Sequence, residues 1–203
     1  MRRQSVILLS GLLAGGLIFA GCGGIKVKRV DVKEKIDVSG QWNDTDSQMV
    51  SQEMIEDCVN RIWLTQFVTK NNRQPVVIVG SIVNRSQEHI NAQVFIKDLE
   101  RSLINSAKVK FVASSDERLQ VRDERENQQL GLTRKETMKK IGDETGADFM
   151  LIGDINAVKD EVDKRYVILY QTNLDLIDLQ TNETVWIGQK MIKKEVTRSR
   201  YSM

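Results

Sequence analysis

The last third of the chain contains two long stretches in which apolar and polar residues alternate. They span Tyr166–Leu179 and Glu183–Val196 and are separated by the short polar sequence Gln180-Thr181-Asn182. Alternation places every second side chain on the same face, which is typical of a half-buried β-strand, and the short connection favours antiparallel pairing. The sequence therefore predicts a C-terminal β-hairpin that closes a sheet.

Three further stretches have the composition of strands. Val76–Val83 opens with four consecutive β-branched residues, and such an unbroken apolar run predicts a central strand that is buried on both faces. Phe149–Val158 opens with a similar apolar run, whereas Val109–Val112 is short and alternates. Together with the hairpin, these stretches predict a sheet of about five strands.

Helical periodicity marks two segments in the first half of the chain. Apolar residues recur at every fourth position from Val50, after N-cap candidates at Asp44–Ser47. This pattern predicts one helix that runs to about Lys70 and ends before Pro75, the only proline of the chain. A second helix is predicted over Ala92–Ala107.

Two further helices are predicted from capping boxes, in which a hydroxyl residue and a Glu three positions later satisfy each other's backbone N–H groups. Ser114 and Glu117 open a helix over Asp116–Gln129, which is polar nearly all round. A second box opens a helix that is expected to run to Thr145. Thr133 and Glu136 form this box. Met138 and Ile141 are expected to face inward, and Gly146 is expected directly beyond the C-terminus of the helix.

The predicted order of elements is α-β-α-β-α-α-β-β-β. This order indicates an α/β fold with α+β-like segregation: a mixed sheet of about five strands flanked by about four helices and closed by the C-terminal β-hairpin. Cys58 and Trp186 are expected to be core residues, because each lies in an apolar pattern.

The N-terminus has the pattern of a signal peptide. Arg2 and Arg3 precede an apolar or small-residue run over 6–20, which is shorter than the roughly 20 residues needed to span a bilayer. Small residues then stand directly before Cys22, and this arrangement resembles a bacterial lipobox, although Phe19 stands where Leu is usual. The motif implies a diacylglycerol and an N-acyl chain on Cys22. The alternative is an ordinary secretory signal that is cleaved before a cysteine.

These observations predict four parts of the chain. They are a lipoprotein signal peptide over 1–21, a short tether over 22–40, a globular domain over 41–196 and a frayed tail over 197–203. The tether contains no Pro-rich or Gly/Ser-rich spacer, and it spans at most roughly 60 Å. Its scattered valines leave open that part of it adds to the sheet as a strand.

The charge and the motifs argue against several functions. Loss of Arg2 and Arg3 with the signal reduces the 30 basic residues to 28, equal to the 28 acidic ones, which is unlike a nucleic-acid-binding protein. With Cys22 acylated, Cys58 has no disulfide partner, and the single His89 allows no His/Cys zinc site. No catalytic motif is present, and Asp154 and Asp175 are expected at solvent-facing strand positions. We therefore expect neither enzymatic activity, nor a metal, nor a small-molecule substrate.

Several segments resemble the LpoB family. The resemblance covers most of the mature chain, and it is carried by the strand Val76–Asn84, the helix Val94–Ser106, QQLGLT at Gln128–Thr133, TGADFMLIGDI at Thr145–Ile155 and DLQTNETVWIGQK at Asp178–Lys190. It implies a domain similar to the N-terminal domain of TolB. It also implies an outer-membrane lipoprotein that activates a bifunctional (class A) penicillin-binding protein by contact and needs no cofactor beyond the acyl chains.

The resemblance also leaves differences and alternatives. The family has a long proline-rich linker, which the tether here lacks, and Gly23 after Cys22 favours the periplasmic face of the outer membrane. A subunit of a curli-type secretion complex is a second reading, and a small hydrolase is a third. For a docking site, the polar helix Asp116–Gln129 is the candidate, with Arg122 and Arg125 as the residues predicted to bind the partner.

Overall fold

The structure is a computed structural model that describes residues 28–31, 34–142, 144–162 and 165–197. The chain divides into two compact units, Met1–Glu34 and Lys35–Met203, and all described helices and strands lie in the second. The predicted signal peptide, Cys22 and the tail beyond Thr197 lie outside the described residues. The described part of the tether forms no strand.

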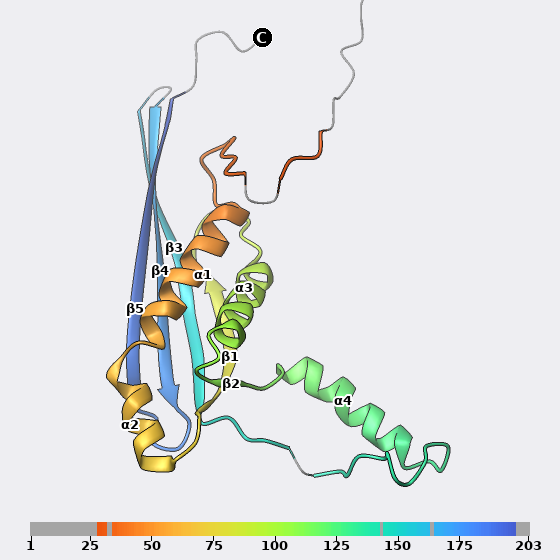
Figure 1. The fold of residues 1–203 in the computed structure, drawn as a ribbon. Coiled ribbons are helices and arrows are strands. Elements are labelled where there is room, and N and C mark those ends of the chain that lie inside the picture. Colours follow the sequence, from red (N-terminus) through yellow and green to blue (C-terminus); the bar gives the residue numbers. More distant parts are fainter. Residues whose placement is uncertain (1–27, 32–33, 143, 163–164, 198–203) are drawn as a thin grey trace, which may run out of the picture. The chain divides into compact units, whose positions relative to one another are not determined.

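The second unit is built on one five-stranded sheet with the order β2-β1-β3-β4-β5 (Figure 1). The strands are β1 (Val76–Asn84), β2 (Lys110–Phe111), β3 (Phe149–Val162), β4 (Arg165–Asp178) and β5 (Thr184–Thr197). β1 pairs in parallel with β2 and β3, whereas β3, β4 and β5 are antiparallel. The mixed five-stranded sheet and the C-terminal hairpin are therefore confirmed.

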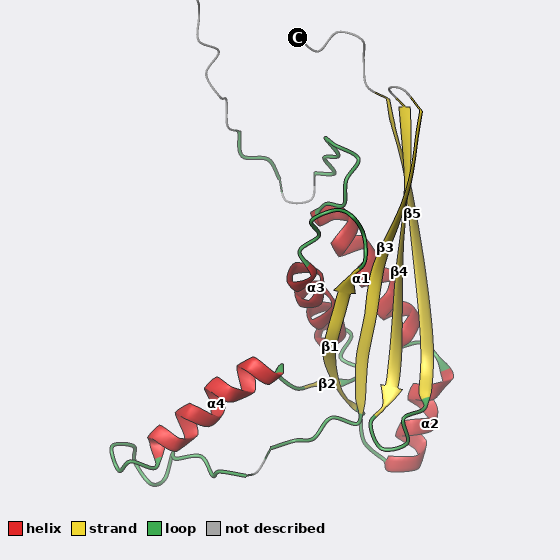
Figure 2. Ribbon diagram, turned by 180° about the vertical axis from the view of Figure 1, so that it is seen from behind, coloured by secondary structure: helices red, strands yellow, loops and turns green. Residues whose placement is uncertain are grey.

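Among the described residues four helices accompany the sheet, as predicted, but they are not the same four. They are α1 (Asp44–Cys58), α2 (Ile62–Asn71), α3 (Ala92–Asn105) and α4 (Ser115–Gln128). Figures 1 and 2 show α1 and α3 together on one face of the sheet. The capping box that was predicted for α4 forms: the Ser114 side chain accepts from the Glu117 N–H, and the Glu117 carboxylate accepts from the Ser114 N–H.

The prediction of a single helix from Asp44 to Lys70 is wrong. α1 ends at Cys58, and α2 begins at Ile62 after an extended Arg61. The break lets the Trp63 indole N–H donate to the Cys58 carbonyl at 2.8 Å and packs the ring against Phe149, with 5.0 Å between centroids. Burial of one large aromatic side chain thus outweighs the continuity of the helix.

The helix predicted from the box Thr133/Glu136 to Thr145 is absent, since none of the described residues in that range is helical. Ile141, which was expected to face inward, is 61% exposed. A short helix depends on burial of its apolar face, and none of the described residues over 133–142 is buried. Gly142 also has a φ of +96°, a left-handed conformation that a helix interior does not allow.

The core lies between the sheet and the pair α1 and α3. Cys58 and Trp186 are both buried in it, as predicted. The Trp186 indole lies over Gly188, where an added Cβ would be 2.2 Å from the ring, and its N–H donates to Asp57 of α1 at 2.9 Å. A glycine in β5 therefore makes room for the aromatic ring that joins β5 to α1.

Candidate interaction surfaces

Asp154 forms hydrogen bonds within the sheet. The Asp154 carboxylate accepts from the amides of Asn156 and Asn173 at 2.7 and 2.8 Å and pairs with Arg85 at 3.3 Å. Asp175 is half-buried on β4. In the part of the chain that the structure describes, no three His, Cys, Asp or Glu side chains form a group that could hold a metal ion.

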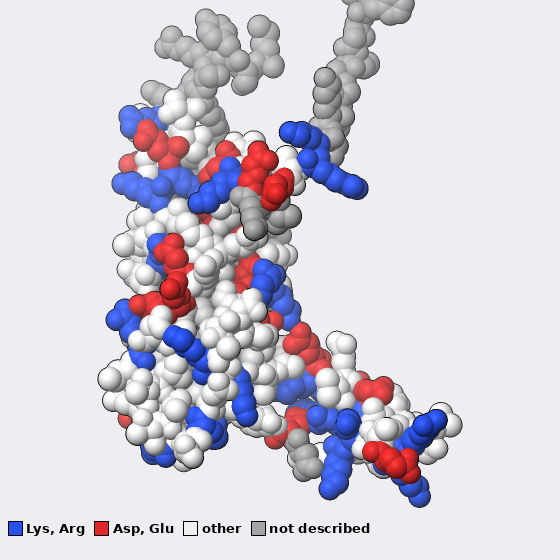
Figure 3. All heavy atoms as spheres, viewed as in Figure 1, with Lys and Arg blue, Asp and Glu red and all other residues white. Residues whose placement is uncertain are grey.

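The chain between β2 and β3 is the most exposed part of the unit. We call residues 113–147, which include α4, the α4 segment. None of its described residues is buried. Figure 3 shows basic side chains gathered over α4 and the chain that follows it, with acidic side chains between them.

The two predicted partner-binding residues lie in the α4 segment and share one carboxylate. Arg122 forms a bidentate pair with Glu144, with both N–O distances at 2.8 Å, and Arg125 reaches the same carboxylate at 3.2 Å. The pair raises the pKa of Arg122 and lowers the pKa of Glu144. The structure thus brings Arg122 and Arg125 together and ties α4 to the end of the segment.

The start of α4 is held to α3 by a second ion pair. The Lys97 ammonium of α3 bridges Glu100 at 2.7 Å and Glu117 at 2.6 Å. Its hydrogen bond to Glu117, together with the Ser114 cap, lowers the pKa of Glu117 to about 2. The first turn of α4 is therefore fixed by side chains, whereas the remainder of the helix has no apolar contact to a core.

The α4 segment also exposes large apolar side chains. They are Leu119, Val121, Leu130, Leu132 and Ile141, of which Leu132 is 94% exposed. Single exposed apolar residues are ordinary on a protein surface, but several in one segment without a core are typical of a site that another macromolecule covers. The sequence did not predict this exposure: Ile141 was expected to face inward, and isolated apolar residues in a polar stretch form no stripe.

The face of the sheet opposite α1 and α3 is a second exposed surface. Its centre is a row of polar side chains. There, the side-chain oxygen Oδ1 of Asn173 accepts hydrogen bonds from the side-chain amides of Gln171 and Gln189 at 3.0 and 3.2 Å. Ile187 and Met191 of β5 stand beside this row and are 70% and 53% exposed. This face therefore presents polar and apolar side chains side by side.

The chain that leads into α1 is fastened to the sheet. The Lys194 ammonium pairs with Asp37 at 2.8 Å and with Asp46 at 2.6 Å, and its side chain is only 10% exposed. The Tyr170 hydroxyl lies 2.7 Å from both carboxylate oxygens of Glu88. Gly40 packs against Val196, which leaves no room for a Cβ. These contacts fix the place at which the chain enters the fold.

The fold defines a class of protein: a small domain with a helix pair on one face of a mixed five-stranded sheet. No helix in the described ranges is long and apolar enough to cross a membrane. The family model described as "Peptidoglycan-synthase activator LpoB" matches residues 46–192. The chain belongs to this family, and the resemblance found in the sequence is confirmed.

Comparison with solved structures returned LpoB domains among the matches. The LpoB C-terminal domain from Escherichia coli is 20% identical, with a TM-score of 0.41 over 70% of this chain and 97% of that chain. The corresponding domain from Salmonella enterica is also 20% identical, with a TM-score of 0.38 over 72% and 98%. The PelC dodecamer from Paraburkholderia phytofirmans is 16% identical, with a TM-score of 0.36 over 62% and 76%. Comparison with curated protein sequences returned no match.

Proposed function

We propose that this chain is a lipid-anchored periplasmic protein that binds a class A penicillin-binding protein and activates its synthesis of peptidoglycan. The observation that carries the proposal is the match to the synthase-activator family over residues 46–192. The protein would act by contact and not by chemistry. An activator of this kind must bind the active conformation of the synthase more tightly than the inactive one.

The α4 segment is the proposed docking surface. Its apolar side chains, Leu130 and Leu132 among them, are exposed, and burying them against a partner would contribute about 25 cal/mol per Å² of apolar area. Arg122 and Arg125 belong to the same segment and would orient the contact through charge. Protein–protein interfaces usually combine apolar contacts with polar and charged ones.

Charge reversal tests this surface. With the full chain and its cognate synthase, Arg122→Glu with Arg125→Glu should weaken binding at least tenfold and abolish activation of glycan polymerisation. Lys110→Glu with Lys193→Glu makes the same change in net charge at exposed sites on β2 and β5 and should have little effect. Unchanged synthase affinity of the Arg122/Arg125 variant would remove the α4 segment as the docking site.

A third variant separates direct contact from positioning. Glu144→Gln removes the acidic partner of both guanidinium groups but leaves those groups in place. If Arg122 and Arg125 contact the synthase, this variant retains activation. Loss of activation by Glu144→Gln as well would mean that the ion pairs position the segment instead of contacting the partner.

The proposed anchor is Cys22, which carries a diacylglycerol and an N-acyl chain at the periplasmic face of the outer membrane. Several acyl chains on one residue hold a protein at a membrane far more firmly than a single chain, which binds reversibly. Mass spectrometry of the mature protein should find the acylated cysteine at its N-terminus. Cys22→Ser should move the protein from the outer-membrane fraction to the soluble periplasm, and an unmodified Cys22 would contradict the anchor.

A further inference from the structure

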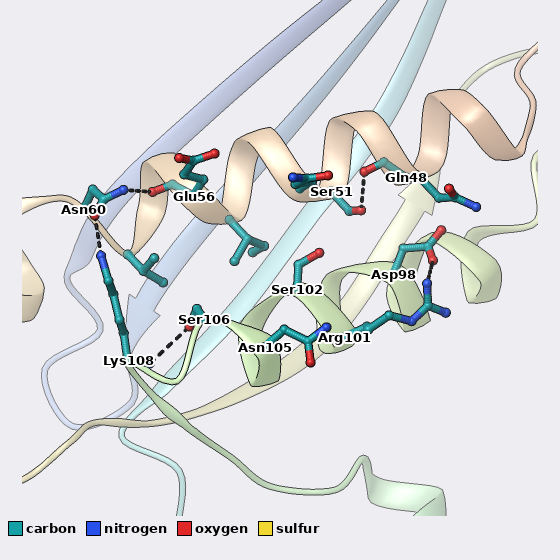
Figure 4. A pocket seen from close by; sticks show the side chains of 13 residues that line it. Gln48, Ser51, Glu56, Asn60, Asp98, Arg101, Ser102, Asn105, Ser106 and Lys108 are labelled. Carbon is teal, nitrogen blue, oxygen red and sulfur yellow. Dashed lines mark hydrogen bonds and ion pairs between the residues drawn. The ribbon is translucent and has the colours of Figure 1, made fainter. Parts of the chain in front are cut away.

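A polar groove runs between α1 and α3, on the helices that cover the sheet (Figure 4). Its volume is about 620 Å³, within the range of about 300–1,000 Å³ that is usual for small-ligand sites. Ile55 and Val59, both buried, form an apolar floor. The groove shares no lining residue with the α4 segment, so it is separate from the proposed docking surface.

The walls of the groove carry hydrogen-bonding groups that the protein does not use itself. The side chains of Gln48 and Gln52 on α1 and of Ser102 and Asn105 on α3 form no hydrogen bond within the described part of the chain. Figure 4 shows Ser102 directed from α3 towards α1. Two helices thus present amide and hydroxyl groups, which both donate and accept, to one space.

Other lining residues are fixed by the protein. Asp98, whose side chain is 8% exposed, accepts from Arg101 at 2.9 Å. The Lys108 ammonium donates to the Asn60 side chain, and that contact joins the chain after α3 to the end of α1. The groove therefore has a buried carboxylate in its wall.

The charges of the lining balance. Asp98 and Glu56 oppose Arg101 and Lys108, so the groove has no excess positive charge for a phosphate or a nucleic acid. It also has no aromatic lining residue, although aromatic anchors are typical of the centre of a protein interface. A ligand with few polar groups would leave the groove's amides unsatisfied on binding, which is unfavourable.

We propose that this groove binds an oligosaccharide of N-acetylated amino sugars. Such a chain is neutral and rich in hydroxyl and acetamido groups, so it can satisfy amides on both walls at once. Its C–H faces and acetyl methyl groups suit the floor formed by Ile55 and Val59. This goes beyond the proposed function, because docking on a synthase requires no contact with the glycan itself.

The test uses the full chain and tri-N-acetylchitotriose as the probe. Titration should shift backbone amide resonances of α1 and α3 in two-dimensional NMR spectra, and calorimetry should give the Kd. Gln52→Ala with Asn105→Ala should weaken binding about tenfold, because two neutral hydrogen bonds are lost. Both residues are exposed, so the variant should keep its melting temperature.

Two controls make the result specific. Gln120→Ala with Asn127→Ala removes the same two amides from the exposed surface of α4 and should leave the Kd unchanged. Cellotriose lacks the acetamido groups and should bind more weakly than the probe. The proposal is overturned if millimolar chitotriose causes no shifts, if the shifts lie outside α1 and α3, if the groove variant binds as well as the wild type, or if cellotriose binds equally.

The experiment also separates this proposal from the proposed function. The variant Gln52→Ala with Asn105→Ala should still activate the synthase, since neither residue belongs to the α4 segment. Absence of saccharide binding with intact activation would overturn the glycan site alone. Saccharide binding without activation would support the glycan site and contradict the proposed function.

Discussion

Replacing Tyr170 with Phe tests the contact that fastens the loop before α3 to the sheet. Tyr170 is fully buried on β4, and its hydroxyl lies 2.7 Å from both Glu88 carboxylate oxygens. Burial and the neighbouring Glu88 carboxylate raise the pKa of Tyr170, so its hydroxyl is a donor at neutral pH. In the variant, the Glu88 carboxylate loses this donor but keeps the longer hydrogen bond from the Trp42 backbone N–H at 3.3 Å.

The expected cost follows from the charge of the acceptor. A hydrogen bond to a charged group contributes about 1.5–3 kcal/mol, and Phe retains nearly all of the apolar contact. A loss of about 2 kcal/mol lowers Tm by roughly 4–8 °C in a domain of this size. Urea denaturation at pH 7 should show a lower midpoint with an unchanged m-value, because the surface exposed on unfolding does not change.

A double-mutant cycle with Glu88→Gln isolates the pair. The coupling energy should be about 1 kcal/mol or more if the two side chains interact as described. Tyr166→Phe, which removes a hydrogen bond to the neutral Ser39 carbonyl, serves as the control and should cost only about 0.5–1.5 kcal/mol. A coupling energy near zero, or equal losses for the two tyrosines, would refute the reasoning.

Three further predictions concern the fold. The hydrogen bond from Arg73 lowers the pKa of Asp148, so this carboxylate should stabilise the protein above its unfolded pKa of about 3.9 and lose that effect as pH falls through the lower folded pKa. The stability difference between wild type and Asp148→Asn, measured by urea denaturation, should therefore be large at pH 7 and small in strong acid; a constant difference would contradict it. Gly188→Val should displace the Trp186 indole, cost about 1–3 kcal/mol and change the tryptophan fluorescence; an unchanged spectrum and Tm would count against the packing described. Burial raises the pKa of Cys58 to about 12, so a thiol reagent should label it only after unfolding, and rapid labelling of the folded protein would disagree with its burial.

The two capping boxes show that a local motif alone does not determine whether a helix forms. Both pair a hydroxyl residue with Glu three positions later, and only the one at Ser114 opens a helix. A cap contributes only about 1 kcal/mol, which does not form a helix without further support. The first turn of α4 gains that support from Lys97 of α3, a residue of a different element. Such help from a distant residue is not visible in the motif itself.

The break between α1 and α2 has the same origin. The spacing of apolar residues is continuous through Cys58 and Ile62, so periodicity alone predicts one helix. The chain turns between the two helices because the packing of Trp63 against Phe149, 86 positions later, stabilises the fold more than a continuous helix would. The polar character of the helix Asp116–Gln129 predicts a docking surface with Arg122 and Arg125, but only the structure shows that both arginines pair with Glu144.

By itself, the sequence determined the number and kind of strands and the burial of Cys58 and Trp186, because periodicity and local motifs record which face of each element is apolar. The family followed from the resemblance of several segments to LpoB, which the family model confirmed. The tertiary structure alone decided which α4 residues remain exposed, how Glu88 meets Tyr170 and how the polar groups of α1 and α3 come to face one groove. Those features join residues that are far apart in the chain. Their contacts depend on how the elements pack together, and no local pattern encodes that packing.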